Sequence, residues 1–255
     1  MTYVLLYHDI AFPAERDTVG FPGGPAGRYK LKPALFEAHL EAIDATGVDV
    51  GLVGPGATLR GAALSFDDAG GSALSAADRL EERGWRGHFF VPTAYIGAAG
   101  FLGPEALREL ADRGHDLGSH SHTHPAYMGR LPRAQVLDEW RRSRDILGEL
   151  LGREPATASV PGGSLSGTVV ECAAEAGYQV LMTSEPTSRV SHQDGLQCVG
   201  RYAIWATTPA GRAAAYVRGA RVPRAHLWLA WNAKKLAKRV DSPLYERVRS
   251  ARSRL

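Results

Sequence analysis

Two short groups of polar residues have the side-chain types needed to hold a metal ion and to move a proton. Asp67 and Asp68 are adjacent carboxylates, and His120 and His124 follow later in the chain, four residues apart. Imidazole nitrogen and carboxylate oxygen are ligands of Zn²⁺, and a catalytic zinc site uses three protein ligands so that one position stays open. A spacing of four lets two histidines face one ion. One aspartate with both histidines would form such a set, and the other aspartate would remain free to accept a proton.

Each group also has a simpler interpretation, because His-rich segments can be solvated loops and adjacent aspartates often lie in turns or helix caps. The segments that precede them favour the metal site. The apolar run 62–66 indicates a buried strand that ends at Asp67, and residues 116–119 indicate a weaker strand that leads to His120. Strands that end in ligand-type residues point to one mouth of an α/β sheet or barrel, where such folds place their chemistry.

Apolar segments alternate with helical patterns along the chain, which predicts α/β architecture in one domain. The expected strands are Val4–Tyr7, Leu64–Asp67, His88–Val91, Asp116–Ser119, Ala158–Pro161, Gln179–Thr183 and Gln197–Arg201. The expected helices are Pro33–Thr46, Ser72–Arg83, Pro104–Arg113, Pro132–Leu151, Ser166–Ala176 and Pro209–Arg218. Seven such units suggest a barrel, and the Pro- and Gly-rich segment 11–30 is either a rim loop that shapes a substrate groove or a surface excursion.

Three ordered motifs carry a resemblance to a known family. They are Ser65-Phe66-Asp67-Asp68, the segment from Asp116 to Pro125, and Ser159-Val160-Pro161-Gly162-Gly163. They resemble the polysaccharide deacetylases, which are the NodB-homology proteins of carbohydrate esterase family 4, and the likeness extends from Tyr7-His8-Asp9 to Thr183-Ser184. The resemblance implies a single-domain distorted (β/α)7-type barrel over residues 1–221. It also implies a hydrolase that uses one divalent metal ion, usually zinc, to remove acetyl groups from N-acetylated sugars.

The resemblance also assigns roles to particular residues. Asp68, His120 and His124 would hold the metal, a metal-bound water would be the nucleophile, and Asp67 would be the general base. Pro161 and Gly162 would line the substrate, with a backbone N–H near Gly162 donating to the oxyanion.

Three departures from the family pattern affect these roles. Ala69 stands where a glycine is expected after the aspartate pair, and Ser159 stands where many members carry the arginine that supports the base. The late Leu-x-His motif, which supplies the usual general acid, is not found. His8, His192 and His226 are substitutes in principle, and we select His8 because it follows the first strand and would reach the catalytic face.

The sequence therefore predicts a metal-dependent hydrolase that removes N-acetyl groups from a sugar or glycan precursor. One alternative is a deformylase or other non-peptide amide hydrolase of the same superfamily. Another is a catalytically weakened member that only binds glycan, which the missing arginine and the missing late histidine would favour.

Composition excludes several other classes. The 255 residues include 44% hydrophobic and 22% charged residues, which is typical of a globular protein, and the two cysteines, Cys172 and Cys198, are too few for a disulfide scaffold. We found neither a signal peptide nor an apolar run of about 20 residues, and expect a cytoplasmic protein. The sequence has no recognised nucleic-acid-binding motif and no band of basic residues outside the C-terminal region, so we expect no nucleic-acid partner.

The C-terminal region 222–255 is expected to be a basic helical extension that packs on the barrel or trails from it. From Lys234 to Leu255 it carries eight lysines and arginines against two acids, although the net charge of the chain is only +3. Its segment Leu227-Trp228-Leu229-Ala230-Trp231 either faces the barrel or makes a weak peripheral contact with an anionic membrane.

Overall fold

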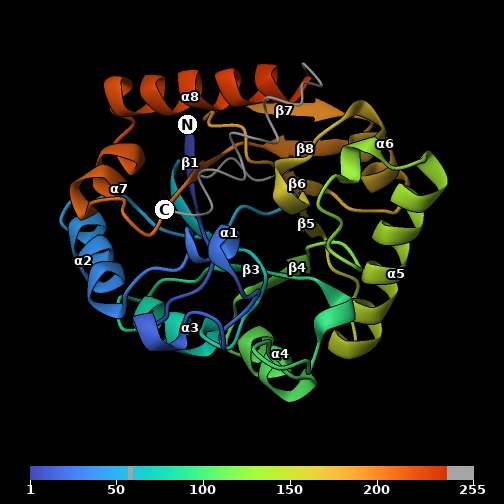
Figure 1. Cartoon of the computed structure of the whole chain (residues 1–255), viewed down its shortest axis with the longest axis horizontal. Coiled ribbons are helices and arrows are strands. Elements are labelled where there is room, and N and C mark those ends of the chain that lie inside the picture. The colour runs from blue at the N-terminus through green and yellow to red at the C-terminus, as the bar shows by residue number, and fades with distance from the viewer. Residues whose placement is uncertain (57–59, 240–255) are drawn as a thin grey trace.

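The computed structural model describes residues 1–56 and 60–239. Its centre is a nine-stranded sheet in the order β7-β8-β6-β5-β4-β3-β2-β1-β9 (Figure 1). Every neighbouring pair is parallel except β7 and β8, which are antiparallel. The strands are β1 (Thr2–Tyr7), β2 (Gly61–Phe66), β3 (His88–Val91), β4 (Asp116–Ser119), β5 (Thr157–Ser159), β6 (Val180–Met182), β7 (Val190–Gln193), β8 (Leu196–Val199) and β9 (Arg201–Ala203).

Helices surround this sheet on the outside (Figure 1). They are α2 (Pro33–Asp44), α3 (Ala73–Glu81), α4 (Pro104–Asp112), α5 (Arg133–Leu151), α6 (Gly167–Glu175), α7 (Ala210–Val217) and α8 (Arg221–Arg239), with the single turn α1 (Gly24–Gly27) in the rim loop. Proline opens or precedes several of them, because its fixed φ suits the first turn and its missing N–H is not needed there. The expected helices are found, with ends shifted by one or two residues. The predicted α/β architecture in one domain is confirmed, with a largely parallel sheet surrounded by helices.

The strand predicted at Gln197–Arg201 is wrong in one respect, because it is two strands that pair with different neighbours. β8 pairs with β6 through Val199, and β9 pairs with β1 from Arg201 onward. Gly200 lies between them, and a Cβ there would stand 2.4 Å from the carbonyl oxygen of Glu185 and 2.5 Å from Thr187 Cγ2. Glycine is therefore required where the chain changes partner. This run of chain connects the two ends of the β1–β6 sheet.

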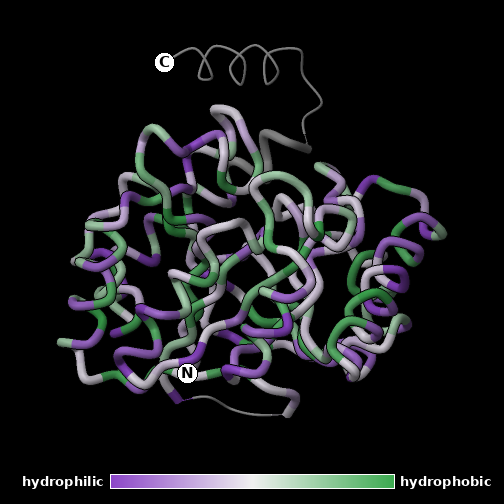
Figure 2. Tube along the Cα trace, turned by 90° about the horizontal axis from the view of Figure 1, so that it is seen from below, coloured by the Kyte–Doolittle hydropathy of each residue, from purple (hydrophilic) through white to green (hydrophobic). Residues whose placement is uncertain are grey.

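The core lies between the sheet and its helices. β2 is buried along its whole length, as expected for a parallel strand covered on both faces. On the outer side, Leu5, Leu64 and Phe89 pack against apolar faces of the helices, including Leu40 of α2 and Leu80 of α3. Figure 2 shows hydrophobic and hydrophilic colours alternating along the peripheral helical turns, as expected for helices with one face on a core.

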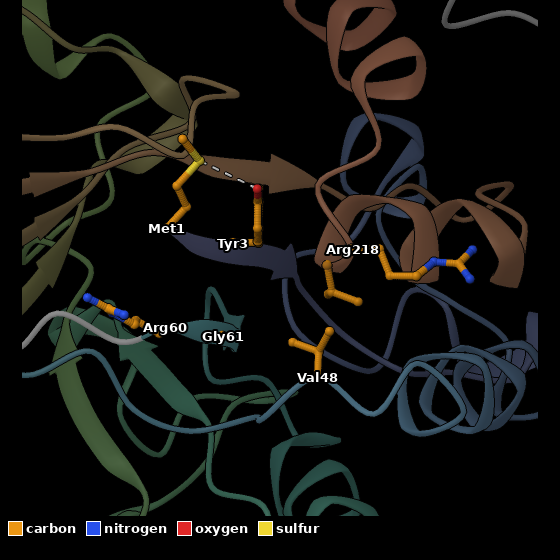
Figure 3. A pocket seen from close by; sticks show the side chains of 7 residues that line it. Met1, Tyr3, Val48, Arg60, Gly61 and Arg218 are labelled. Carbon is orange, nitrogen blue, oxygen red and sulfur yellow. Dashed lines mark hydrogen bonds between the residues drawn. The ribbon is translucent and has the colours of Figure 1, made fainter.

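The two ends of the barrel-like sheet differ, because one has a pocket and the other has the aspartate and histidine motifs. At the amino-terminal ends of β1 and β2 there is a pocket of about 840 Å³ lined by Met1, Tyr3, Val48, Arg60 and Gly61 (Figure 3). The aspartate pair and the histidine motif lie at the opposite, carboxyl-terminal ends of the strands, after β2 and β4. Among the described residues, no helix is long and apolar enough to cross a bilayer. Residues 240–255 of the predicted C-terminal extension lie outside the described part of the chain, as do 57–59.

Candidate active site

The aspartate pair begins at the end of β2, where the backbone turns sharply. Asp68 and Ala69 have positive φ values of 77° and 45°, a conformation that costs free energy for residues other than glycine. The backbone N–H of Asp67 donates to the carbonyl of Tyr7 at 3.0 Å, which fixes the turn against β1. Both carboxylates are buried, and the turn directs them to the same end of the sheet as the histidines of the second motif.

The histidine segment follows β4 and is also in a strained turn, with positive φ at Ser121 (63°) and His124 (56°). The Glu139 carboxylate of α5 supports it by accepting hydrogen bonds from the backbone N–H groups of His122 (2.9 Å) and Thr123 (2.7 Å). The Nδ1 atom of His122 lies 2.9 Å from Thr93 Oγ1, so this imidazole is engaged away from the metal-ligand set. His120 and His124 remain as the pair that the spacing predicted.

Asp68, His120 and His124 converge as the sequence predicted. Their candidate ligand atoms all lie within 4.8 Å of one another. Asp68 Oδ1 is 3.6 Å from His120 Nε2 and 3.5 Å from His124 Nε2. This carboxylate oxygen is buried and has no hydrogen-bond partner among the described residues. A buried acceptor without a donor costs free energy, and a cation bound between the three residues would satisfy it. The donor set therefore fits a divalent metal ion.

The electrostatics of these ligands support the same conclusion. Burial raises the pKa of Asp68 well above its usual range, and the negative charges of Asp67 and Asp9 raise it further. Burial lowers the pKa of His120 to about 3 and also lowers that of His124, so both rings are neutral at physiological pH. Neutral imidazole is the form that binds metals. A bound cation would also favour the ionised form of the buried Asp68 carboxylate.

Asp67 is held by an arginine that the sequence analysis did not identify. Arg201, at the start of β9, donates from Nη1 to Asp67 Oδ1 at 2.7 Å and from Nη2 to Asp67 Oδ2 at 2.9 Å. The guanidinium is fully buried and its Nε donates to the carbonyl of Thr183 at 3.1 Å. Burial alone would raise the pKa of Asp67, but the charge of Arg201, together with His120 and the Arg201 hydrogen bonds, lowers it below its usual range.

Ser159, which occupies the expected arginine position, lies beside the same carboxylate. Its Oγ donates to Asp67 Oδ1 at 3.1 Å and lies 2.6 Å from His120 Nδ1. A serine here leaves room for the guanidinium that arrives from β9. The available sequence signal was Arg201 itself, a charged residue within an apolar strand pattern, which is rarely buried without a partner.

His8 follows β1 directly, and its ring is close enough to Asp67 for the two groups to interact electrostatically. Its ring stacks on Tyr29 of the rim loop, with ring centroids 4.4 Å apart. Burial lowers the pKa of His8 to about 4, although the charge of Asp67 acts to raise it. The Nδ1 atom of His8 is buried and has no hydrogen-bond partner in the described structure.

The rim loop 11–30 forms an aromatic border around the metal-ligand set. Phe21 lies against the ring of His124, with centroids 4.6 Å apart, and Tyr29 approaches Trp205, which is 42% exposed, at 6.0 Å. Lys30 holds the loop together, because its ammonium group donates to the carbonyl of Phe21 at 2.6 Å and to the carbonyls of Arg16 and Val19. Of the two interpretations of this segment, the structure supports the rim loop.

Pro161 and Gly162 follow β5, the strand next to β4, and so lie at the same end of the sheet. Gly162 has φ +57°, and a Cβ there would stand 3.2 Å from the carbonyl oxygen of Ala126. Both features favour glycine at a tight turn near the histidine segment. His115, by contrast, bonds Glu81 and the backbone of Gly87 away from these residues.

Comparison with known proteins agrees with this geometry. The sequence pattern of the family described as polysaccharide deacetylase matches residues 57–181, which include the aspartate pair, both histidines and the Pro161-Gly162 turn. Over these 125 of its 255 residues, the chain is similar to the polysaccharide deacetylase family. It is a hydrolase of carbon–nitrogen bonds other than peptide bonds, and the family implies a carbohydrate substrate.

Solved structures of polysaccharide deacetylases share the fold. A polysaccharide deacetylase from Bacillus cereus has a TM-score of 0.70 and 19% identity, and the match covers 85% of this chain and 68% of that one. IcaB from Ammonifex degensii has a TM-score of 0.67 and 21% identity, covering 85% and 97%. Streptococcus pyogenes deacetylase PplD, solved in complex with acetate, has a TM-score of 0.67 and 20% identity, covering 82% and 94%. No curated protein matches the chain by sequence.

Proposed function

We propose that this deacetylase removes N-acetyl groups from an N-acetylated sugar or glycan precursor with the help of one divalent cation, Zn²⁺. Asp68, His120 and His124 would hold the ion, and Asp67 would act as the general base. The observation that carries the proposal is the buried, unsatisfied Asp68 Oδ1 atom with two neutral imidazole nitrogens 3.5–3.6 Å away. Two nitrogens and one oxygen form a set that suits zinc.

The cation, when bound, would polarise water and the amide carbonyl, which lowers the cost of the negative charge that develops in the reaction. The remaining steps belong to the protein. Asp67 is ionised throughout the physiological pH range because of Arg201, so it can accept a proton. Its Oδ2 atom accepts one hydrogen bond, from Arg201, and a carboxylate oxygen has room for a second. A carboxylate of low pKa is a weak base, and the proton it accepts is readily passed on to the departing amine.

His8 is proposed as the residue that carries this proton. Its Nδ1 is buried without a hydrogen-bond partner in the described structure, the charge of Asp67 acts on the ring, and the ring stacks on Tyr29. With a pKa of about 4 the ring is neutral before the reaction, so His8 would act as a carrier that receives the proton during turnover. Pro161 and Gly162 are proposed to line the substrate, where the absence of a side chain at residue 162 allows close approach to the backbone.

The experiment that tests the function measures acetate and formate released from N-acetylated and N-formylated sugars, with the metal stripped and then restored. We expect acetate release that stops on metal removal and returns with Zn²⁺, accompanied by about one ion per chain. Asp67→Asn is the matched control, because it should keep the ion and lose turnover. Formate as the only product would indicate the deformylase alternative. Acetate release that survives complete metal removal would contradict the proposal.

A further inference from the structure

Helix α8 has an unusual charge content and an exposed apolar side. Its 19 residues, Arg221–Arg239, include six lysines and arginines and no acidic residue. Val222 is 66% exposed, Leu229 is 58% exposed and Trp228 is 51% exposed. Figure 1 shows the helix lying along the periphery of the molecule, from α7 toward β7. This helix takes no part in the proposed chemistry, so its surface requires a separate explanation.

The orientation of α8 is fixed by residues on its inner side. Arg224 donates to the hydroxyl of Tyr202 (2.8 Å), to the carbonyl of Gly219 (3.1 Å) and to Ser188 Oγ (3.0 Å). Its guanidinium also lies over the ring of Tyr3, 5.2 Å from the centroid. Leu227, one turn along, packs against the core cluster beneath the helix. A helix held in this way cannot rotate its outer side inward.

The apolar residues on the outer side have helical spacing. Val222, Ala225, Leu229 and Ala233 stand three or four residues apart and are all exposed, so they form one continuous stripe. We call these four residues, with the neighbouring Trp228, the α8 stripe. An isolated exposed leucine needs no explanation, but a continuous exposed stripe on a helix anchored by the half-buried Arg224 favours a contact surface.

We propose that the α8 stripe docks on an anionic lipid surface. An interfacial helix has apolar side chains that enter the acyl boundary, tryptophan at the headgroup level and basic residues nearby, with no acids to oppose the lipid charge. α8 has exposed apolar residues with tryptophan and no acidic residue, and its sequence carries Lys234, Lys235, Lys238 and Arg239 in its last turns. A helix without acids complements an anionic surface, and the exposed apolar stripe with tryptophan favours a lipid surface among anionic partners. Anionic headgroups would attract each of these cations.

The test is binding of the full chain to vesicles of phosphatidylcholine alone and of phosphatidylcholine with phosphatidylglycerol, measured by flotation. We expect binding about tenfold tighter, or more, to the anionic vesicles, since each basic residue near the surface contributes. This binding should weaken as salt is added. The double variant Val222→Ser/Leu229→Ser should reduce it by about tenfold or more, because two large apolar side chains no longer enter the lipid.

Matched controls separate this effect from a general loss of surface hydrophobicity. Phe12→Ser removes an aromatic side chain of the rim loop that is 58% exposed, and it should bind vesicles as the natural protein does. Lys234→Gln/Lys235→Gln should weaken only the anionic binding. Circular dichroism and acetate release from a soluble sugar should be unchanged in the stripe variants, so that a failure here is distinct from a failure of the proposed function.

The proposal is overturned if anionic vesicles do not bind or if the stripe variant binds equally. It is also overturned if light scattering shows a dimer that the stripe variant dissociates, since a second copy would then cover this surface.

Discussion

Asp67 and Asp68 are neighbours in the chain, but the structure places them in opposite electrostatic environments. Asp67 receives two hydrogen bonds from Arg201 and one from Ser159, and its pKa lies below the usual range. Asp68 receives no hydrogen bond at Oδ1, and its pKa lies well above that range. Asp67 has a cationic partner within the fold, whereas Asp68 would gain one only from the metal ion proposed above. Environments that separate two pKa values in this way assign different tasks to similar groups.

The largest loss of turnover is expected when Asp68, the carboxylate without a cationic partner in the fold, is replaced. Asp68→Ala removes the oxygen ligand, and turnover should fall on the order of 10⁴-fold, because metal-based stabilisation contributes several kcal/mol at 1.36 kcal/mol per tenfold. The metal content per chain and the rate of acetate release should fall together. A variant that keeps full metal content would show that the histidines suffice for binding and would weaken the assigned role of Asp68.

The second effect separates the two aspartates. Asp67→Asn keeps the shape of the side chain but removes its ability to accept a proton, so turnover should fall by about 10³-fold. Metal content should stay near that of the natural protein, unlike in Asp68→Ala. Acetate release measured beside metal content checks this. Equal loss of metal in both variants would show that Asp67 is also a ligand.

The third effect tests Arg201 as a positioning residue. Arg201→Met leaves Asp67 buried and unpaired, so the pKa of Asp67 should rise and the acid limb of the kcat/KM profile should move to higher pH. At neutral pH the loss should be about 10- to 100-fold, as for other groups that orient a catalytic residue. Arg201→Lys, which retains the charge but not the paired hydrogen bonds, should restore part of the profile. An unchanged acid limb in Arg201→Met would remove Asp67 from the role of base.

The same variant has a stability readout with a defined sign. In the natural protein the lowered pKa of Asp67 contributes stability above the unfolded pKa of about 3.9, and this is lost as the pH falls toward the folded pKa. In Arg201→Met the raised pKa reverses the contribution, so the variant should lose stability relative to the natural protein as the pH rises. At neutral pH we expect a cost of about 3–5 kcal/mol. Urea unfolding at acid and neutral pH measures both values.

The smallest effect is expected at Ser159. Ser159→Ala removes one of three hydrogen bonds to Asp67 and a contact with His120, while Arg201 keeps the carboxylate in place. Turnover should fall about 3- to 10-fold, in line with about 1 kcal/mol for one hydrogen bond. Steady-state kinetics with metal content as the control checks this. A loss as large as that of Arg201→Met would show that the serine, and not the arginine, orients the base.

Sequence reasoning located the residues that are close together in local motifs. The spacing of His120 and His124, and the strands that precede each motif, were sufficient to predict that they meet Asp68 at one end of the sheet. Helix positions were also predictable, because proline starts, glycine ends and apolar periodicity are local signals.

The remaining features depend on contacts between distant segments. Arg201 meets Asp67 only because β9 pairs with β1, which no local pattern around either residue specifies. β7 was missed because its residues are largely exposed and polar, so they lack the apolar pattern of a strand. Ser159 in place of the motif arginine left open what holds Asp67, and only the fold shows that Arg201 of β9 does so.

The split run from β8 to β9 gives the site an order of assembly. Arg201 is the first residue after Gly200, where the chain leaves β6 and joins β1. The metal-ligand residues all lie in segments that precede this run, whereas the base gains its arginine only when the last strand docks. A nascent or partly unfolded chain without that docked strand would have ligands for the ion but a misplaced base. If Asp67 is the general base, as proposed, its arginine partner would be in place only in a chain whose last described strand has joined β1.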